Sequence, residues 1–332
     1  MTATDDSSTR SVMEQHRNAP SPRRTRRARL AGAAVLAAAV VALPFATTAA
    51  AAAPAAPGAA SDAASAATGG AGTTNVAYVE VNNHDLASVG RYEYADGSPV
   101  YDLAIIFAAN IDWDGTEAVL SLNDRVQATL DAADEQIRPL QAKGIDVSLS
   151  ILGNHQGAGI ANFGSPEEAA DFAAQVADVV ERYGLDGVDL DDEYSEYGVN
   201  GTAQPNDDSA GWLISALRAE LPDAVLSFYD IGPASDSLAT QDPAVNAQLD
   251  LAWNPYYGSW RVPAIPGLTK QQLSPAAVDV QATSTSTTQA LAERTVREGY
   301  GVFLTYNLPD DDRSAFVSTF TRVLSGQDAY WR

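Results

Sequence analysis

The chain of 332 residues contains no cysteine and only three histidines. The absence of cysteine excludes disulfide bonds, thiolate catalysis and cysteine-ligated metal sites. The histidines His84 and His155 lie far apart in the sequence and do not form the paired spacing that is typical of a transition-metal site. We therefore expect no metal and no cofactor.

Basic residues are scarce after the first 29 positions, where seven of the 20 Lys and Arg residues lie. From Thr73 onward the chain has 13 basic and 39 acidic residues, which leaves a formal charge of −26. Such a surface repels nucleic acid and anionic membranes, so neither is expected as a partner. We also expect a monomer.

The chain begins with a basic segment and a short apolar one. Residues 17–29 read RNAPSPRRTRRAR, and an alanine-rich apolar stretch follows from Leu30 to Ala46. This order is typical of a secretory signal peptide, which we assign to residues 1–50 with an approximate cleavage site. A transmembrane anchor is the weaker alternative, because the stretch is short and is interrupted by Pro44.

Residues 51–74 are rich in Ala, Gly, Ser and Pro and contain few large apolar groups. Such a segment cannot bury enough surface to fold, so we predict a disordered spacer. The catalytic domain is then expected to span residues 75–332. The protein is expected to be secreted and not to bind the membrane once the signal has been removed.

From Asn75 onward short apolar runs alternate with longer stretches of helical spacing. The predicted strands are Val76–Val81, Leu103–Ala109, Asp146–Leu152, Gly187–Glu193, Val225–Ile231, Leu249–Trp253, Ala277–Gln281 and Val302–Tyr306. The predicted helices are Asn123–Lys143, Pro166–Tyr183, Ser209–Leu221, Thr287–Glu298 and Asp311–Leu324. Eight strands with intervening helices in about 250 residues indicate a single (β/α)₈ TIM barrel. The units after the first and sixth strands show little helical periodicity and are expected to be helix-poor.

A row of acidic residues lies on the fourth predicted strand, in the segment YGLDGVDLDDEYSEY from Tyr183 to Tyr197. Side chains alternate along a strand, so Asp189, Asp191 and Glu193 share one face, about 6 to 7 Å apart. Crowded carboxylates raise one another's proton affinity, which keeps a proton donor available near neutral pH.

Three interpretations of the acidic row remain open at this point. A divalent metal would accept carboxylate ligands, including Asp192, but the spacing does not match a calcium loop. Buried acids could be structural, which suits Asp189 in particular. Glycoside hydrolysis would use Glu193 as the proton donor to the leaving oxygen.

In a TIM barrel, functional residues gather at the carboxyl ends of the strands. Amides, carboxylates and aromatic rings dominate those positions here, and this mixture is suited to carbohydrate. Asn154 and Tyr306 are candidate substrate-binding residues of this kind.

The segment DGVDLDDE from Asp186 to Glu193 resembles the DxxDxDxE signature of family 18 glycoside hydrolases. The segments VAYVEVNN, FAANI, LGNHQGAG, AWNPYYG and GYGVFLTYNL are similar to those of secreted endoglycosidase H-type endo-β-N-acetylglucosaminidases. The resemblance extends from Asn75 to the C-terminus. Ser150-Ile-Leu-Gly153 departs from the SxGG pattern of many chitinases, so we assign no catalytic role to that segment.

The resemblance implies a substrate-assisted, retaining mechanism. Glu193 would be the general acid and then the base, Asp191 would orient the 2-acetamido group of the substrate, and Asp189 would tune Asp191. Asn254 and Tyr256 would hold the acetamido group.

The implied activity is that of an endo-β-N-acetylglucosaminidase. It would cut the β-1,4 bond of the N,N'-diacetylchitobiose core of high-mannose or hybrid N-glycans on glycoproteins. A chitinase acting on linear N-acetylglucosamine polymers and a non-catalytic glycan-binding barrel are the alternatives.

Overall fold

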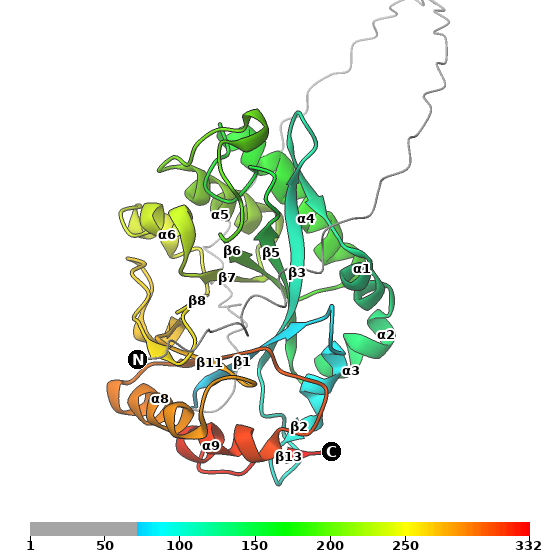
Figure 1. Cartoon of the computed structure of the whole chain (residues 1–332), viewed down its shortest axis with the longest axis vertical. Helices are drawn as coiled ribbons and strands as arrows, with labels where there is room; N and C mark the ends of the chain where they lie inside the picture. Colours follow the sequence, from blue (N-terminus) through cyan, green and yellow to red (C-terminus); the bar gives the residue numbers. More distant parts are fainter. Residues whose placement is uncertain (1–71) are drawn as a thin grey trace, which may run out of the picture. The chain divides into compact units, whose positions relative to one another are not determined.

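The computed structural model describes residues 72–332. These residues fold around eight parallel strand positions, and Figure 1 shows several of these strands at the centre of the domain. These positions are β1 (Thr74–Glu80), β3 (Leu103–Trp113), β5 (Asp146–Gly153), β6 (Gly187–Asp191), β7 (Val225–Tyr229), β8 (Leu251–Trp253), β10 (Leu273–Ser274) with β11 (Ala276–Asp279), and β12 (Val302–Tyr306). Each strand pairs in parallel with the next, and β12 pairs with β1, which closes the circuit. The predicted (β/α)₈ barrel is confirmed.

The seventh barrel position is divided between two short strands. β10 pairs with β8, β11 pairs with β12, and Pro275 lies between them. Because proline has no N–H group, it interrupts a strand ladder at its own position. The prediction of one strand over Ala277–Gln281 therefore missed the part of this position that closes the barrel against β8.

The helices pack outside the strands. They are α1 (Asp124–Asp131), α2 (Ala133–Gln136), α3 (Arg138–Gln141), α4 (Pro166–Tyr183), α5 (Ser209–Glu220), α6 (Gly232–Leu238), α7 (Pro243–Asn246), α8 (Thr285–Glu298) and α9 (Ser314–Leu324), with 3₁₀ turns at Leu86–Arg91, Val199–Gly201 and Lys270–Gln272. Ser165 caps the N-terminus of α4 by accepting from the Glu168 N–H, and Gly184 ends it with φ +58°. A polar cap followed by Pro166 starts a helix, and a left-handed glycine stops it.

The prediction of one continuous helix over Asn123–Lys143 is wrong. The segment forms α1, α2 and α3, with breaks at Ala132 and Ile137. Pro139 lies in the first turn of α3, the only part of a helix that tolerates a residue without an N–H group. The units after β1 and β8 contain only 3₁₀ turns and short strands, as predicted.

Four further strands lie outside the barrel circuit. β4 (Ala118–Ser121) forms an antiparallel hairpin with the end of β3, and β9 (Ser259–Trp260) pairs with β11. β2 (Tyr92–Glu93) pairs with β13 (Tyr330–Trp331), which ties the C-terminal residues to the connection between β1 and β3. Figure 1 shows the β3–β4 hairpin extending well beyond the barrel.

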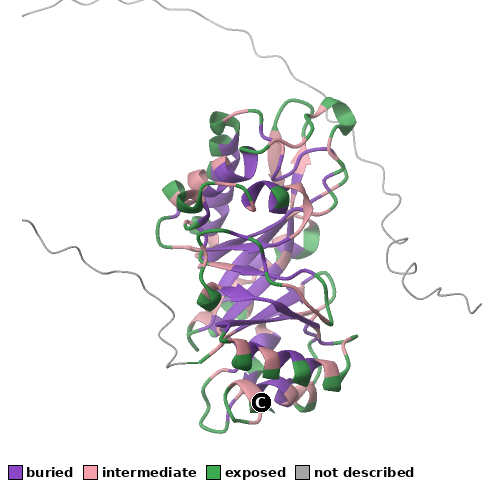
Figure 2. Cartoon of the chain, turned by 90° about the vertical axis from the view of Figure 1, so that its left-hand side faces the viewer, coloured by how far each residue is buried: buried purple, intermediate pink, exposed green. Residues whose placement is uncertain are grey.

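Two apolar clusters account for the core. The larger cluster lies between strands and helices, and alternate residues of β1 such as Ala77 and Val79 belong to it. The smaller one fills the barrel interior and includes Val76, Tyr78 and Trp253. Figure 2 shows the buried strands enclosed by helices whose outer faces are exposed. The two-residue alternation of β1 therefore separates the interior from the helical layer.

The predicted signal peptide and most of the predicted spacer fall outside the described residues. In the part of the chain that the structure describes, no helix has the length and apolar character needed to span a bilayer.

Candidate active site

Strand β6 carries the predicted acids into the barrel. Asp189 and Asp191 are fully buried, and β6 ends at Asp191, so Glu193 lies two residues past the strand and is partly exposed. The backbone N–H of Gly153 donates to the Glu193 carbonyl at 3.0 Å, which extends the pairing of β5 with this segment. A Cβ atom on Gly153 would lie 2.4 Å from the same carbonyl, so only glycine allows this approach.

Three hydroxyl groups hold the deepest acid, Asp189. Tyr78 and Ser150 donate to Oδ2 at 2.7 Å each, and Ser227 donates to Oδ1 at 2.8 Å. The indole N–H of Trp253 in turn donates to the Tyr78 hydroxyl at 2.7 Å. Burial raises the pKa of Asp189, and the three hydrogen bonds oppose that shift. The carboxyl group is therefore fixed in place by strands β1, β5 and β7.

Asp191 has no such support. Both of its carboxyl oxygens are buried and lack a hydrogen-bond partner. Burial, followed by the charges of Glu193 and Asp189, raises the pKa of Asp191 well above its ordinary value. A buried acceptor without a partner is costly, so this carboxyl group is suited to hold a proton or to accept a hydrogen bond from a ligand.

Glu193 is placed where it can act as an acid. Its pKa is raised, first by burial and then by the negative charge of Asp192. A raised pKa keeps the carboxylic acid protonated at a higher pH than an ordinary glutamate. The side chain is also partly open to solvent, whereas Asp189 and Asp191 are not.

An aromatic wall forms around the acids. Tyr229 and Tyr257 share a hydrogen bond between their hydroxyl groups, and the ring of Tyr257 stacks on Tyr306 with centroids 4.6 Å apart. The hydroxyl of Tyr306 donates to Glu80 at the end of β1. The charge of Asp191 helps to raise the pKa of both Tyr229 and Tyr257, after burial. Tyr229 and Tyr257 therefore lie close to the acids, and we call these two residues together with Tyr306 the tyrosine wall.

Of the predicted substrate-binding residues, the structure places Tyr306 in this wall. Tyr256 is 51% exposed and its ring lies under the Arg261 guanidinium at 5.4 Å, while the neighbouring Tyr257 joins the wall. Both tyrosines belong to the same short motif, and sequence spacing does not reveal which ring turns inward.

The two predicted amides are occupied by contacts within the protein. Asn254 is buried; its Nδ2 donates to the Pro275 carbonyl at 2.9 Å and its Oδ1 accepts from the Tyr256 N–H at 3.0 Å. Asn154 donates to Asp112 at 2.8 Å. Both therefore shape loops at the carboxyl ends of the strands, and a direct contact with substrate stays a prediction for each.

Sequence reasoning missed Ser150, Ser227 and Tyr78, and it selected Tyr256 in preference to the neighbouring Tyr257. The serines and Tyr78 occupy inward positions of their strands, but a hydroxyl in a strand does not show that an acid lies opposite. Only the register of β5 and β7 against β6, which pairs Ser150 and Ser227 with Asp189, brings them together.

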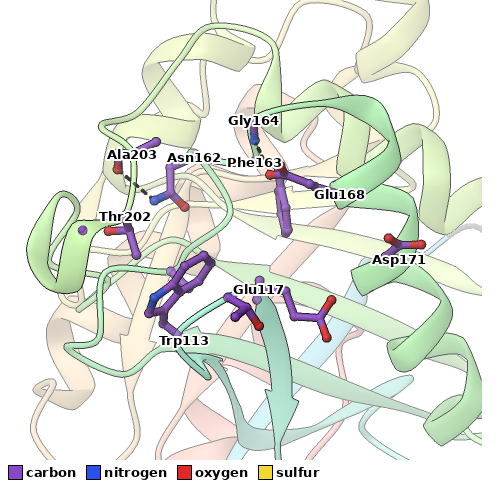
Figure 3. A pocket seen from close by; sticks show the side chains of 13 residues that line it. Trp113, Glu117, Asn162, Phe163, Gly164, Glu168, Asp171, Thr202 and Ala203 are labelled. Carbon is purple, nitrogen blue, oxygen red and sulfur yellow. Dashed lines mark hydrogen bonds between the residues drawn. The ribbon is translucent and has the colours of Figure 1, made fainter.

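A pocket of about 380 Å³ lies beside the β3–β4 hairpin (Figure 3). It is lined by Trp113, Asn162 and Thr202, together with residues at the start of α4. The Asn162 amide is already used, because it donates to the carbonyls of Gly157 and Ala203. None of the acids on β6 lines this pocket, so the row of acids and not this cavity defines the candidate site.

The donor set does not favour a metal. Within residues 72–332, no group of three or more His, Asp or Glu side chains is arranged to hold a metal ion. Of the acids in this segment, Asp189 and Asp192 instead accept hydrogen bonds from hydroxyl groups.

Comparison with known proteins identifies the family. The pattern of glycosyl hydrolases family 18 matches residues 74–266. An endo-beta-N-acetylglucosaminidase from Flavobacterium sp. (strain SK1022) is 64% identical over 259 residues, which cover 78% of this chain and 82% of that protein. The chain belongs to glycosyl hydrolases family 18. It is a glycoside hydrolase, and the resemblance seen in the sequence is confirmed.

Three further proteins extend the comparison. Endo-beta-N-acetylglucosaminidase F1 from Elizabethkingia meningoseptica is 33% identical over 251 residues, or 73% of either chain. EndoBT-3987 from Bacteroides thetaiotamicron, solved with a Man9GlcNAc2Asn substrate, is 27% identical with a TM-score of 0.68. The match to this structure covers 79% of this chain and 68% of that chain. The match to a second EndoBT-3987 structure, with a Man5GlcNAc product, covers 79% of this chain and 63% of that chain. A chitinase from Pseudoalteromonas aurantia, 17% identical with a TM-score of 0.56, shares the fold.

Proposed function

We propose that this protein is an endo-β-N-acetylglucosaminidase that cuts the β-1,4 bond between the two core N-acetylglucosamines of N-linked glycans. The 64% identical relative bears that activity in its name, and EndoBT-3987 was solved with an N-glycan attached to asparagine. The substrates are high-mannose or hybrid glycans of glycoproteins.

The pairing of Asp191 with Glu193 is the observation that carries the proposal. Glu193 is a partly exposed acid with a raised pKa, and Asp191 is a buried acid with two unpartnered oxygens. The N–H group of a substrate 2-acetamido group would give Asp191 the hydrogen bond that it lacks. This contact would turn the acetamido carbonyl oxygen toward the anomeric carbon.

The reaction then proceeds in two steps, as family 18 membership implies. The acetamido oxygen attacks the anomeric carbon while Glu193 donates its proton to the glycosidic oxygen, so the bond to the leaving sugar breaks and an oxazolinium ion forms. Glu193, now ionised, takes a proton from water, and the water oxygen opens the ring with retention of configuration. The nucleophile belongs to the substrate, which explains why one strand can carry every acid.

Asp189 and the tyrosine wall assist without exchanging the proton with substrate. The three hydroxyl donors hold Asp189 beneath Asp191, where its charge raises the proton affinity of Asp191. Tyr257 offers a hydroxyl group and a ring face beside the acids, which suits the acetamido group and the apolar face of a sugar.

A chitinase is the second candidate, because it would use the same acids on a linear polymer. Solved chitinases are 9% to 17% identical to this chain over the matched regions, which supports a shared fold alone. A silent glycan-binding barrel is disfavoured by Glu193, since binding alone needs no proton donor with a raised pKa.

We further propose that the protein is exported through its N-terminal signal and acts outside the cell as a monomer. The basic and apolar segments of residues 1–50 support export. N-terminal sequencing of the protein recovered from culture medium would test this, and a start at Met1 would overturn it.

Treating a denatured high-mannose glycoprotein with the purified enzyme tests the activity. The expected product keeps one N-acetylglucosamine on each glycosylated asparagine, measured by the mass of the protein. An unchanged mass, or loss of both N-acetylglucosamines, would contradict the proposal. Release of N-acetylglucosamine oligomers from chitin at a comparable rate would favour the second candidate.

A further inference from the structure

Asp192 is a buried acid that lies between Asp191 and Glu193, the two acids of the proposed mechanism, along the chain. It follows Asp191 on the chain, so it points to the opposite side of the β6 segment, out of the barrel. Only 3% of its surface is exposed. Within residues 72–332 no Lys, Arg or His forms an ion pair with it.

The hydrogen bonds of Asp192 join three loops. Its Oδ2 accepts from the backbone N–H of Ala234 at 2.7 Å, in the first turn of α6 after β7. Its Oδ1 accepts from the hydroxyl of Tyr197, in the loop after β6. The same hydroxyl accepts from the N–H of Ala161 at 3.0 Å, in the loop after β5. One carboxyl group therefore ties together the segments that follow β5, β6 and β7.

Two glycines, Gly232 and Gly159, allow neighbouring backbone segments to pack closely against Asp192 and Tyr197. Gly232 has φ +72°, and a Cβ atom there would lie 2.1 Å from the Asp192 carbonyl and 2.7 Å from Oδ2. A Cβ atom on Gly159 would lie 2.4 Å from the Tyr197 hydroxyl. Gly232 therefore meets Asp192 itself, and Gly159 meets its partner Tyr197, at positions that exclude any side chain.

The charge of Asp192 also reaches the proton donor. Burial raises the pKa of Asp192 to about 6, against hydrogen bonds led by that from Tyr197. Above that pH the ionised carboxylate raises the pKa of Glu193, the next residue along the chain. Like charges this close favour the protonated form of the neighbour.

We propose that Asp192 is a positioning residue: its hydrogen bonds lock the loops around Glu193 in place, and its negative charge lies beside the proton donor and favours the protonated form of Glu193. The expected effect on catalysis rests on the proposed function. The hydrogen bonds of Asp192 to Tyr197 and Ala234 do not depend on it.

Several other titratable groups lie near Glu193 and Asp192, and a test of Asp192 must leave these side chains unchanged. Asp191 lies on the same strand segment, Tyr194 follows Glu193, and Tyr229 and Tyr257 face Glu193 from the ends of β7 and β8. Tyr197 is the titratable group that contacts Asp192 directly. A single substitution at position 192 leaves all of these side chains unchanged.

The substitution Asp192→Asn tests the charge. The amide keeps the shape of the carboxyl group and can still accept from the Ala234 N–H and donate to Tyr197. We expect the basic limb of the kcat/KM profile against pH to move to lower pH by about 0.5 to 1 unit, because Glu193 loses its proton more easily. An unmoved basic limb would overturn the charge role.

Asp146→Asn is the matched control. The pKa of Asp146 is also raised to about 6, but the residue lies at the start of β5, at the opposite end of the barrel from the acids. Its replacement removes a comparable ionisable group and should leave the pH profile where it is. A shift of equal size in both variants would mean that a general charge effect, and not Asp192, is responsible.

Tyr197→Phe tests the tie separately from the charge. This variant keeps the carboxylate but removes the hydrogen bond to the β5 loop, so we expect kcat to fall about 10-fold without a shift of the basic limb to lower pH. A kcat equal to that of the wild type would overturn the positioning role. Circular dichroism and thermal melting would verify that each variant is folded.

A direct titration makes the result independent of activity. The Glu193 carboxyl carbon can be followed by NMR in protein labelled with ¹³C-glutamate, with Glu193→Gln identifying its signal. The pKa of Glu193 should be lower in Asp192→Asn than in the wild type, and equal values would contradict the proposal. If no glycan is cleaved at all, the proposed function fails while this comparison still decides the role of Asp192.

Discussion

At the scale of single residues, environment gives three carboxyl groups on one segment three different properties. Asp189 receives three hydroxyl hydrogen bonds, Asp191 receives none, and Glu193 is partly open to solvent. Burial raises the pKa of all three, and only hydrogen bonds or exposure moderate that shift. The division of roles therefore follows from partners and not from residue type.

Replacing Glu193 with Gln should abolish most of the activity while the fold remains intact. The amide has nearly the same shape as the acid but cannot donate a proton to the leaving oxygen, and general acid catalysis contributes about 10²- to 10⁴-fold. The measurement is kcat on an N-glycopeptide, with thermal melting as the check on folding. Activity within a few-fold of the wild type would place the proton donor elsewhere.

The neighbouring tyrosines offer a matched pair of substitutions. Tyr257→Phe removes a hydroxyl group of the tyrosine wall beside Asp191, so kcat/KM should fall by about 10-fold, as for one lost hydrogen bond of about 1 kcal/mol or more. Tyr256→Phe alters an exposed side chain and should change kcat/KM less than two-fold. The reverse order would show that Tyr256 holds the acetamido group, as the sequence resemblance implies.

At the scale of elements, the site depends on close contact between loops that follow different strands. β6 is shorter than predicted and ends at Asp191, yet the Glu193 segment stays in place because Gly153 and Gly232 allow backbone to touch backbone. Sequence patterns can mark a glycine but cannot show which distant segment it approaches.

Gly232→Ala should be destabilising and should lower activity. The new Cβ would meet the Asp192 carbonyl at 2.1 Å in addition to the strain of a positive φ, which by itself costs about 1 kcal/mol or more. Gly326→Ala is the control, because Gly326 has φ +75° with nothing within 4 Å of the added atom. The melting temperature should fall further in Gly232→Ala, and kcat should fall in that variant alone. Equal losses would mean that the backbone angle, and not the contact, matters.

At the scale of the whole molecule, acids gather at both ends of the barrel and affect stability as well as catalysis. Asp102, Asp146 and Asp186 lie around the starts of the strands, away from the site. The pKa of Asp146 is raised to about 6, first by burial and then by the charges of Asp186 and Asp102. The native state therefore binds more protons than the unfolded state between the ordinary aspartate pKa and about 6.

Because the native pKa of Asp146 is raised, the stability of the wild type should fall as pH increases through about 4 to 6. Asp146→Asn removes this penalty, so it should raise the free energy of unfolding at pH 7 by roughly 1 kcal/mol, the full shift being reduced by partial exposure. Urea unfolding at pH 7 and at pH 4 measures this, and the gain should nearly vanish at pH 4. A loss of stability at pH 7 would contradict the assignment.

Much of the architecture could be predicted from local patterns. The eight strand positions and the boundaries of α4 were predicted closely, because alternation and helix caps are local properties of the chain. The helix over Asn123–Lys143 was not predicted correctly. Pro139 lies in the first turn of a new helix, and the helical spacing of apolar residues on both sides of Pro139 conceals this break. The division of the seventh strand at Pro275 was also missed, because β10 on one side of this proline is only two residues long.

The sequence by itself determined the fold class, the family and the identity of the acidic row, since these depend on motifs and on periodicity within one segment. Only the tertiary structure decided which groups surround each acid: the hydroxyls on Asp189, the lack of hydrogen-bond donors at the buried Asp191, the inward ring of Tyr257 and the loops tied by Asp192. These contacts join residues that are far apart along the chain. The register between strands and the packing of loops decide which residues meet in these contacts. Neither can be read from the sequence pattern of a single segment.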